Sequence, residues 1–376
     1  MSTKSATVLQ PIDAAVETTA SASVPLPPAA NASHVSKPIS LNALFSVLSM
    51  VGLGFVNPLI RLCRGEPAQP QLRELWQLAG VPLLAIAIFL FAWSRVSATI
   101  ETSLGHIPGP IAVWQQTQAL WADHKAERAK AEAFYERQAK RNATKLAEDS
   151  TAAIVTRKYT GKPTYFDQIV TSLKTVFLGF LLATLLAVPV GIFCGLSKSM
   201  NAALNPLIQI FKPVSPLAWL PIVTIVVSAV YVTDDPMFEK SFLISAITVT
   251  LCSVWPTIIN TALGVASIDK DLLNVAKVLQ LPWQTKLFKL VMPSSLPLIF
   301  TGMRLSLGVG WMVLIASEML AQNPGLGKFV WDEFQNGSSD SLARLLVAVF
   351  TIGLIGFALD RVMLTLQSAF SFGAQR

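Results

Sequence analysis

Residues 169–196 read IVTSLKTVFLGFLLATLLAVPVGIFCGL, a predominantly apolar stretch whose length suits a membrane-spanning helix. About 20 apolar residues in a helix cross the roughly 30 Å hydrocarbon core of a bilayer. No water is available there to backbone polar groups, so a helix, which pairs them internally, is the expected structure. This stretch therefore predicts a transmembrane helix.

The composition of the whole chain agrees with that prediction. Hydrophobic residues make up 52% of the 376 residues and charged residues only 14%, whereas soluble domains carry about 25% charged residues. Other apolar stretches are also long enough to cross a membrane. They are 81–96, 211–232, 242–265, 296–319 and 342–364. We expect an all-α, polytopic membrane protein with about six core helices, of which residues 166–365 form the main domain.

The N-terminal region divides into two expected parts. Residues 1–38 are rich in Ala, Ser, Thr and Pro and lack an apolar run, as is typical of a disordered tail. Residues 39–64 contain an apolar segment with a polar stripe on one helical face and a break at Asn57-Pro58. Two interpretations stay open for this segment. The stripe favours an interfacial helix lying on the membrane, and the alternative is an extra membrane helix.

A long polar interruption, residues 99–165, follows the first core span at 81–98. Between Trp121 and Asp149, alanine alternates with Lys, Arg and Glu, a pattern that predicts a charged helix exposed to water. Acidic residues nearly cancel the basic ones, which favours an ordinary solvated helix over a partner-docking one. We expect this loop to be periplasmic.

The positions of basic residues indicate the orientation. Lys and Arg cluster in the short loops on one side of the predicted helices, and this side should be cytoplasmic. The chain has a net charge of +7, but its basic residues form no single patch. They suit the surface of membrane lipid, and no nucleic-acid partner is expected.

Nothing in the sequence indicates a catalytic or metal site. Cys63, Cys194 and Cys252 show no ligand spacing with each other or with the three histidines. The chain also has no Gly-x-x-x-x-Gly-Lys-Ser/Thr phosphate loop. We therefore expect no metal, no cofactor and no enzymatic activity.

The most informative loop is 266–295, which is too polar to cross a membrane and lies on the basic side. Its residues 272–279 have an apolar helical face that could fit a partner's groove. Leu281-Pro282-Trp283 follows, and then a second stretch that reaches Pro293. The pattern predicts a short helix, a turn and a second helix.

This loop resembles the signature of the ABC importer permease family: Glu-Ala-Ala, three residues, Gly, nine residues and Ile-x-Leu-Pro. Asn274, Val275 and Ala276 fall on the first three positions, Gln280 on the glycine and Pro293 on the final proline. Ala276 and Pro293 are identical to the signature, whereas Asn274 and Gln280 replace its Glu and Gly. The resemblance implies a type I permease fold.

Further stretches resemble the branch of this family that serves nitrate, nitrite, cyanate, sulfonate, taurine and bicarbonate. They are 107–110, 213–221, 301–304, 316–319 and 324–327. Residues 211–216 and 336–339 look most like the nitrate type. The resemblance implies import of a small oxyanion, nitrate first, with a sulfonate or bicarbonate as alternatives. A stand-alone secondary transporter or channel is the alternative from another class.

The resemblance also implies the partners. Cytoplasmic ABC ATPase subunits would bind loop 266–295, a periplasmic substrate-binding protein would deliver the anion, and a second permease copy would complete a homodimer. The protein would be a multi-pass component of the bacterial inner membrane. We expect Ala276→Asp to weaken ATPase association by placing an unpaired charge in that interface.

Ionisable residues inside predicted spans need a reason, because burying charge in a membrane is costly. For Glu318, near the outer end of its span, a structural hydrogen-bonding role and a role in a gate or pathway are equally favoured. Arg304 and Arg361 are expected to reach the cytoplasmic interface. Gly302, Gly308 and Gly310 predict close helix packing.

Overall fold

The computed structural model describes residues 54–374 except 66, 103–104, 149–153, 155 and 233–236. These described residues belong to one compact unit. The predicted tail at 1–38 lies outside the described residues. So do residues 39–53, which belong to the segment interpreted as an interfacial or extra membrane helix. The described part of that segment ends in a short helix, α2 (Val56–Cys63).

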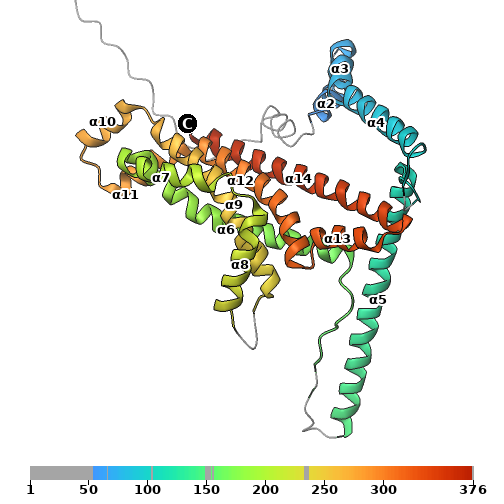
Figure 1. The fold of residues 1–376 in the computed structure, drawn as a ribbon. Helices are drawn as coiled ribbons and strands as arrows, with labels where there is room; N and C mark the ends of the chain where they lie inside the picture. Colours follow the sequence, from blue (N-terminus) through green and yellow to red (C-terminus); the bar gives the residue numbers. More distant parts are fainter. Residues whose placement is uncertain are drawn as a thin grey trace, which may run out of the picture. The chain divides into compact units, whose positions relative to one another are not determined.

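The described residues are almost entirely helical (Figure 1). After α2 come α3 (Ala68–Leu75), η1 (Trp76–Gly80), α4 (Val81–Ser97), α5 (Pro110–Glu148), α6 (Tyr165–Leu196), α7 (Lys198–Phe211), α8 (Pro216–Val230), α9 (Lys240–Ala266), α10 (Lys270–Val278), α11 (Trp283–Lys286), η2 (Leu287–Val291), α12 (Met292–Ala321), α13 (Leu326–Asn336) and α14 (Ser339–Ala374). A two-residue antiparallel pair joins β1 (Glu101–Thr102) to β2 (Gly105–His106).

Within the described residues, five helical stretches are long and apolar enough to cross a membrane, and a bent helix pair raises the total to six. The predicted span at 211–232 needs correction. Its helix, α8, begins only at Pro216, and α7 precedes it at an angle of 101°. Pro213 and Pro216 explain the break, because proline disfavours helical geometry in the residue before it and lacks a backbone donor.

Two other predicted boundaries also shift. The first span is continuous with α3 and η1, so that the helix covers Ala68–Ser97 rather than 81–98. The charged helix begins at Pro110, not at Trp121. Proline is favourable in the first turn of a helix. The charge pattern did not reveal this start, because the residues directly after Pro110 are a mixture of apolar and uncharged polar ones.

The core of the unit is built around α9, which packs against both α6 and α12. Small and hydroxyl side chains allow this close approach. A side chain at Gly302 would meet the Thr257 backbone of α9 at 3.0 Å, and the Thr257 and Ser306 hydroxyl oxygens are 2.7 Å apart. Gly308 was expected to serve the same packing, but a side chain there would meet nothing within 4 Å.

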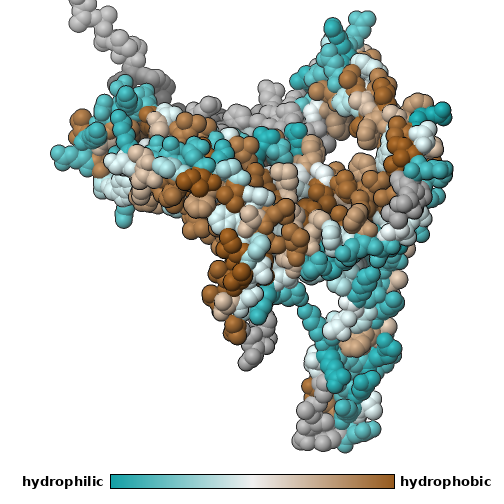
Figure 2. Space-filling view, viewed as in Figure 1, coloured by the Kyte–Doolittle hydropathy of each residue, from teal (hydrophilic) through white to brown (hydrophobic). Residues whose placement is uncertain are grey.

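The two ends of this core carry different structures. At one end, the chain leaves α9, forms α10 and α11, and enters α12; we call this the α10 end. At the other end lie α13 and the beginnings of α6 and α14; we call this the α13 end (Figure 1). Hydrophobic residues cover much of α8 and the neighbouring core, whereas hydrophilic residues dominate the surface of α5 (Figure 2).

Candidate functional site

The helix α10 at the α10 end forms where the sequence predicted a short helix. Asp269 caps it by accepting a hydrogen bond from the Asp271 backbone N–H at 3.0 Å, which satisfies one of the free donors at a helix start. Its inward face is small and apolar. Ala276 is buried at 3% exposure, and Leu273 packs against a buried cluster that includes Val265. This face fixes α10 to the core.

The outward face of α10 is also apolar, although no part of the chain that the structure describes covers it. Leu272, Val275, Val278 and Leu279 expose 47%, 54%, 80% and 63% of their surface. Water-facing helix surfaces are normally polar. A shallow cavity of about 340 Å³ lies along this face, lined by Asp271, Asn274, Val275, Val278 and Leu279. We call these five residues, together with Leu272, the α10 outward face.

Gln280, at the signature glycine position, takes the backbone conformation that glycine favours. Its φ is +48°, in the left-handed region. The Gln280 N–H donates to the Lys277 carbonyl at 3.0 Å, and the Leu281 N–H donates to the Ala276 carbonyl at 3.1 Å. These two bonds form a Schellman motif, which satisfies the last carbonyls of the helix. The turn geometry is therefore kept without the glycine.

The structure places the predicted site residues in different environments. Asn274 and Val275 lie on the outward face, Gln280 makes the turn, and Pro293 stands in the first turn of α12. Ala276 does not belong with the outward residues, because it is buried within the chain. The new charge of Ala276→Asp would therefore enter the core of this chain, and we expect any weakening of ATPase association to follow from the disturbed packing of α10.

Glu318 lies at the α13 end and is fully buried, at 0% exposure. The Ser172 hydroxyl of α6 is 2.9 and 2.8 Å from its two carboxylate oxygens, and the Gly327 N–H of α13 donates to one of them at 3.0 Å. Ser172 also accepts from the Leu326 N–H at 2.8 Å. A side chain at Gly325 would collide with the carboxylate. We call Ser172, Glu318 and the backbone of 325–327 the Glu318 clamp.

Arg304, which was expected to reach the membrane interface, has an acidic partner within the chain. Its guanidinium donates two hydrogen bonds to Asp360 of α14, at 2.5 and 2.9 Å. A paired charge is far less costly in a membrane than an isolated one. Arg361, in contrast, lies over the Phe357 ring at 4.9 Å. The Arg304–Asp360 pair joins α12 to α14.

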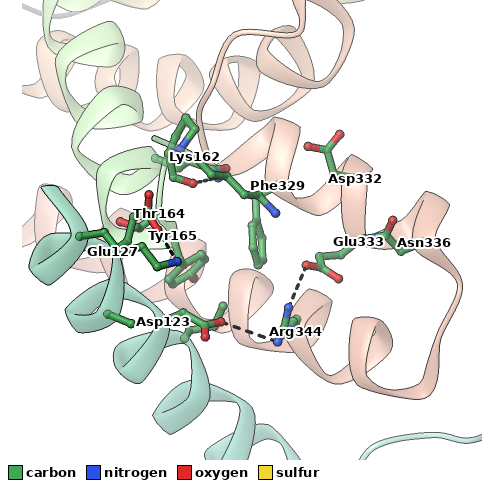
Figure 3. A pocket seen from close by; sticks show the side chains of 15 residues that line it. Asp123, Glu127, Lys162, Thr164, Tyr165, Phe329, Asp332, Glu333, Asn336 and Arg344 are labelled. Carbon is green, nitrogen blue, oxygen red and sulfur yellow. Dashed lines mark hydrogen bonds and ion pairs between the residues drawn. The ribbon is translucent and has the colours of Figure 1, made fainter. Parts of the chain in front are cut away.

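A second group of charges at the α13 end joins α5 to the core (Figure 3). Arg344 of α14 lies between Asp123 of α5, at 3.9 Å, and Glu333 of α13, at 3.8 Å. Its Nε also donates to Gln116 at 3.1 Å. Asp123, Glu333 and Arg344 line part of a cavity of about 290 Å³. The contacts of Arg344 with Asp123 and Gln116 fix the position of α5 against α14.

Comparison with known proteins decides the family. Residues 187–371 match the binding-protein-dependent transport system inner membrane component. The chain is 34% identical over 221 residues to the nitrate import permease of Leptolyngbya laminosa, covering 58% of this chain and 74% of that protein. The chain belongs to this family. It is an ABC transporter permease, a multi-pass protein of the inner membrane.

Two further relatives of this permease come from Synechococcus elongatus. A nitrate import permease is 37% identical over 196 residues, or 52% of this chain and 66% of that protein. A bicarbonate transport system permease is 36% identical over 203 residues, or 54% and 68%. The resemblance to the nitrate and bicarbonate branch, drawn from short stretches such as 213–221, is thereby confirmed.

Sequence reasoning missed the partners of the charged residues. Ser172 stands 146 positions before Glu318, and Asp360 stands 56 positions after Arg304. No spacing rule links residues so far apart. The one available signal was the cost of a charge in a membrane, which requires a partner without identifying it.

Proposed function

We propose that the permease binds a cytoplasmic ABC ATPase subunit through the α10 outward face. The observation that carries this proposal is the exposure of Leu272, Val275 and Leu279 on a helix whose opposite face is anchored in the core. Burying apolar surface in a partner's groove contributes about 25 cal/mol per Å². An amphipathic helix in a groove is a common mode of protein recognition.

The anchoring of α10 supports a mechanical role for this contact. Leu273 packs against a buried cluster that contains Val265, at the end of α9, and Val291, just before α12. A displacement of α10 by a closing ATPase pair would therefore reach both helices as a rigid-body movement. The ATP would be hydrolysed by the separate ATPase subunit, and the permease would contribute the moving helices.

We propose nitrate as the first candidate substrate, delivered by a periplasmic substrate-binding protein. Relatives named as nitrate import permeases, at 37% and 34% identity, support it. Bicarbonate is the second candidate, because relatives named as bicarbonate permeases reach 36% identity. Nitrite, cyanate and sulfonates such as taurine are further candidates of similar chemistry.

Reconstitution would test the substrate. The permease, its ATPase and its binding protein would be placed in proteoliposomes, and ATP hydrolysis would be measured with nitrate, bicarbonate and taurine in parallel. We expect the strongest stimulation by nitrate. Stimulation by bicarbonate alone would make bicarbonate the substrate in place of nitrate. Anion uptake without the ATPase would instead indicate a stand-alone transporter.

We propose that two copies of the permease form the membrane part of the complex. One α10 per chain and ATPases that act in pairs imply two chains. Apolar surface for such contacts is available, because the Ala68–Ser97 helix buries none of its most apolar window within the chain. Mass measurement of the purified complex in nanodiscs should give two permease copies, and a heterodimer would require a second permease chain.

For Glu318 we propose the structural role rather than the gate. Its carboxylate is fully buried and accepts hydrogen bonds from α6 and α13. A gate residue would need to exchange these partners for water or an anion during each transport cycle, and a carboxylate would repel nitrate.

A further inference from the structure

The α5 helix and the segment that follows it form a polar hairpin beyond the core. Residues 156–164 return along α5, as Figure 1 shows. The Arg157 N–H donates to the Gln138 side chain at 2.9 Å, and the Tyr159 N–H donates to the Tyr135 hydroxyl at 3.2 Å. The Phe134 and Tyr159 rings also pack, with centroids 5.5 Å apart. The return segment therefore has a defined position on α5.

Four positive charges meet where this segment lies on α5. A cavity of about 300 Å³ is lined by Phe134, Arg137, Gln138, Arg141, Asn142, Lys145 and Arg157, and no carboxylate is among its lining residues. Arg137, Arg141 and Lys145 are four positions apart and so share one helix face. We call these three residues and Arg157 the basic groove.

Two other basic residues of α5 have acidic partners among the described residues. Arg128 pairs with Asp167, and Lys130 pairs with Glu127 at 3.2 Å. Among the described residues, none of the four basic-groove side chains forms an ion pair. Four like charges gathered around one cavity repel one another, and an anionic ligand would relieve that repulsion.

The dimensions and position of the groove indicate the kind of ligand. Arg137 to Lys145 covers eight helical steps of 1.5 Å, about 12 Å in all, which is too long for one small oxyanion and suits a row of carboxylates. The ion pair of Asp123 with Arg344 connects the hairpin to the α13 end. The α13 end lies at the opposite end of the core from α10. If α10 faces the cytoplasm, the basic groove faces the periplasm.

We propose that the basic groove is a docking site for a carboxylate-rich surface of the periplasmic substrate-binding protein. The inference rests on the proposed function, because it takes the import complex and its orientation from there. Complementary charges would speed the encounter and fix the orientation of the bound protein. Contact through α5 would place that protein over the α13 end, where α6, α13 and α14 meet.

Adjacent residues of α5 provide a matched test. Arg141→Glu alters the groove, whereas Lys140→Glu makes the same change of charge one residue away, outside the residues that line it. Binding of the binding protein to the complete permease–ATPase complex in nanodiscs would be measured at low and moderate salt. We expect Arg141→Glu to raise Kd about tenfold and Lys140→Glu to raise it less than threefold. Arg157→Gln, on the return segment, should also weaken binding while keeping its backbone hydrogen bond.

Three outcomes would overturn the docking site. Equal effects of Arg141→Glu and Lys140→Glu on Kd would show that binding depends on the overall charge of α5 and not on the groove. An unchanged Kd in both Arg141→Glu and Arg157→Gln would remove it. Loss of nitrate or phosphate binding by the permease alone in Arg141→Glu, with unchanged protein binding, would make the groove a small-anion site. In each case, wild-type stimulation of ATP hydrolysis by the binding protein would show that the import function itself stands.

Discussion

Short helices lie near both ends of α12, but they differ in how their surfaces are satisfied. Before α12, α10 presents apolar residues such as Val275 to the outside of the chain. After α12, α13 donates its Gly327 N–H to the buried Glu318 carboxylate and its Leu326 N–H to the Ser172 hydroxyl. At the α13 end, the chain satisfies its own polar groups, whereas at the α10 end it leaves apolar surface uncovered.

This difference separates a structural site from a binding site. A buried polar group is costly unless it is hydrogen-bonded, and the partners of Glu318 come from the same chain. An exposed apolar face has no such internal explanation and indicates a partner. The comparison therefore predicts that substitutions at the Glu318 clamp change the stability of the permease, while substitutions on the α10 outward face change its associations.

The largest effect is expected from Glu318→Ala. It leaves the Ser172 hydroxyl and the Gly327 N–H buried without an acceptor, at about 1–3 kcal/mol for each group. The thermal unfolding midpoint of the detergent-solubilised permease should fall strongly, and Glu318→Gln should recover part of the loss. Asp332→Ala is the control, because this partly exposed carboxylate pairs with Lys328 on its own helix, a contact of about 0.5 kcal/mol. Equal effects of the two alanine variants would contradict the structural role.

A smaller effect is expected at the turn after α10. Gln280→Gly should raise the free energy of unfolding by up to about 1 kcal/mol, because a residue with a side chain is strained at positive φ. The same substitution at Gln284, inside α11, should lower it by about 0.5–1 kcal/mol. Denaturant unfolding of both variants would measure this contrast, and a loss of stability in Gln280→Gly would count against the Schellman turn.

The smallest effect is expected from a partly buried polar contact on the α5 hairpin. The Tyr159 hydroxyl donates to Glu127 at 2.7 Å, and this bond is the main reason why the pKa of Glu127 lies below its usual value of 4.5. A lowered pKa stabilises the hairpin above pH 4.5, and that contribution is lost as the pH falls through the folded-state pKa.

Hydrogen exchange of residues 156–164, corrected for the intrinsic effect of pH, would measure this loss. Exchange should accelerate below about pH 4.5 in the wild type and show little such change in Tyr159→Phe. Tyr135→Phe removes a neighbouring hydroxyl that accepts a hydrogen bond from the Tyr159 backbone N–H, and it should keep the pH dependence. The same acid response in Tyr159→Phe would contradict the assignment.

Much of the fold could be predicted because the bilayer constrains sequence so strongly. Apolar length located the core helices, and spacing located loop 266–295 despite its departures at Asn274 and Gln280. Composition could not show that the third span is bent before Pro216, because the two flanking helices are together apolar enough to count as one span.

The sites were less predictable, since they depend on which side of a helix faces the chain. An apolar pattern marks both faces of α10 and cannot distinguish the buried Ala276 from the exposed Val275. The Ser172–Glu318 and Arg304–Asp360 contacts join helices that are distant in sequence. Only the packing of α6, α12 and α14 brings these residues together.

The neighbouring residues Val275 and Ala276 give the most direct test of the central claim, that the α10 outward face binds the ATPase. Val275→Asp and Ala276→Asp would each be assayed for co-purification of the ATPase and for thermal unfolding of the permease alone. We predict that Val275→Asp lowers ATPase recovery at least tenfold with unchanged unfolding, and that Ala276→Asp lowers the unfolding midpoint itself. Wild-type recovery of the ATPase with Val275→Asp would contradict the account.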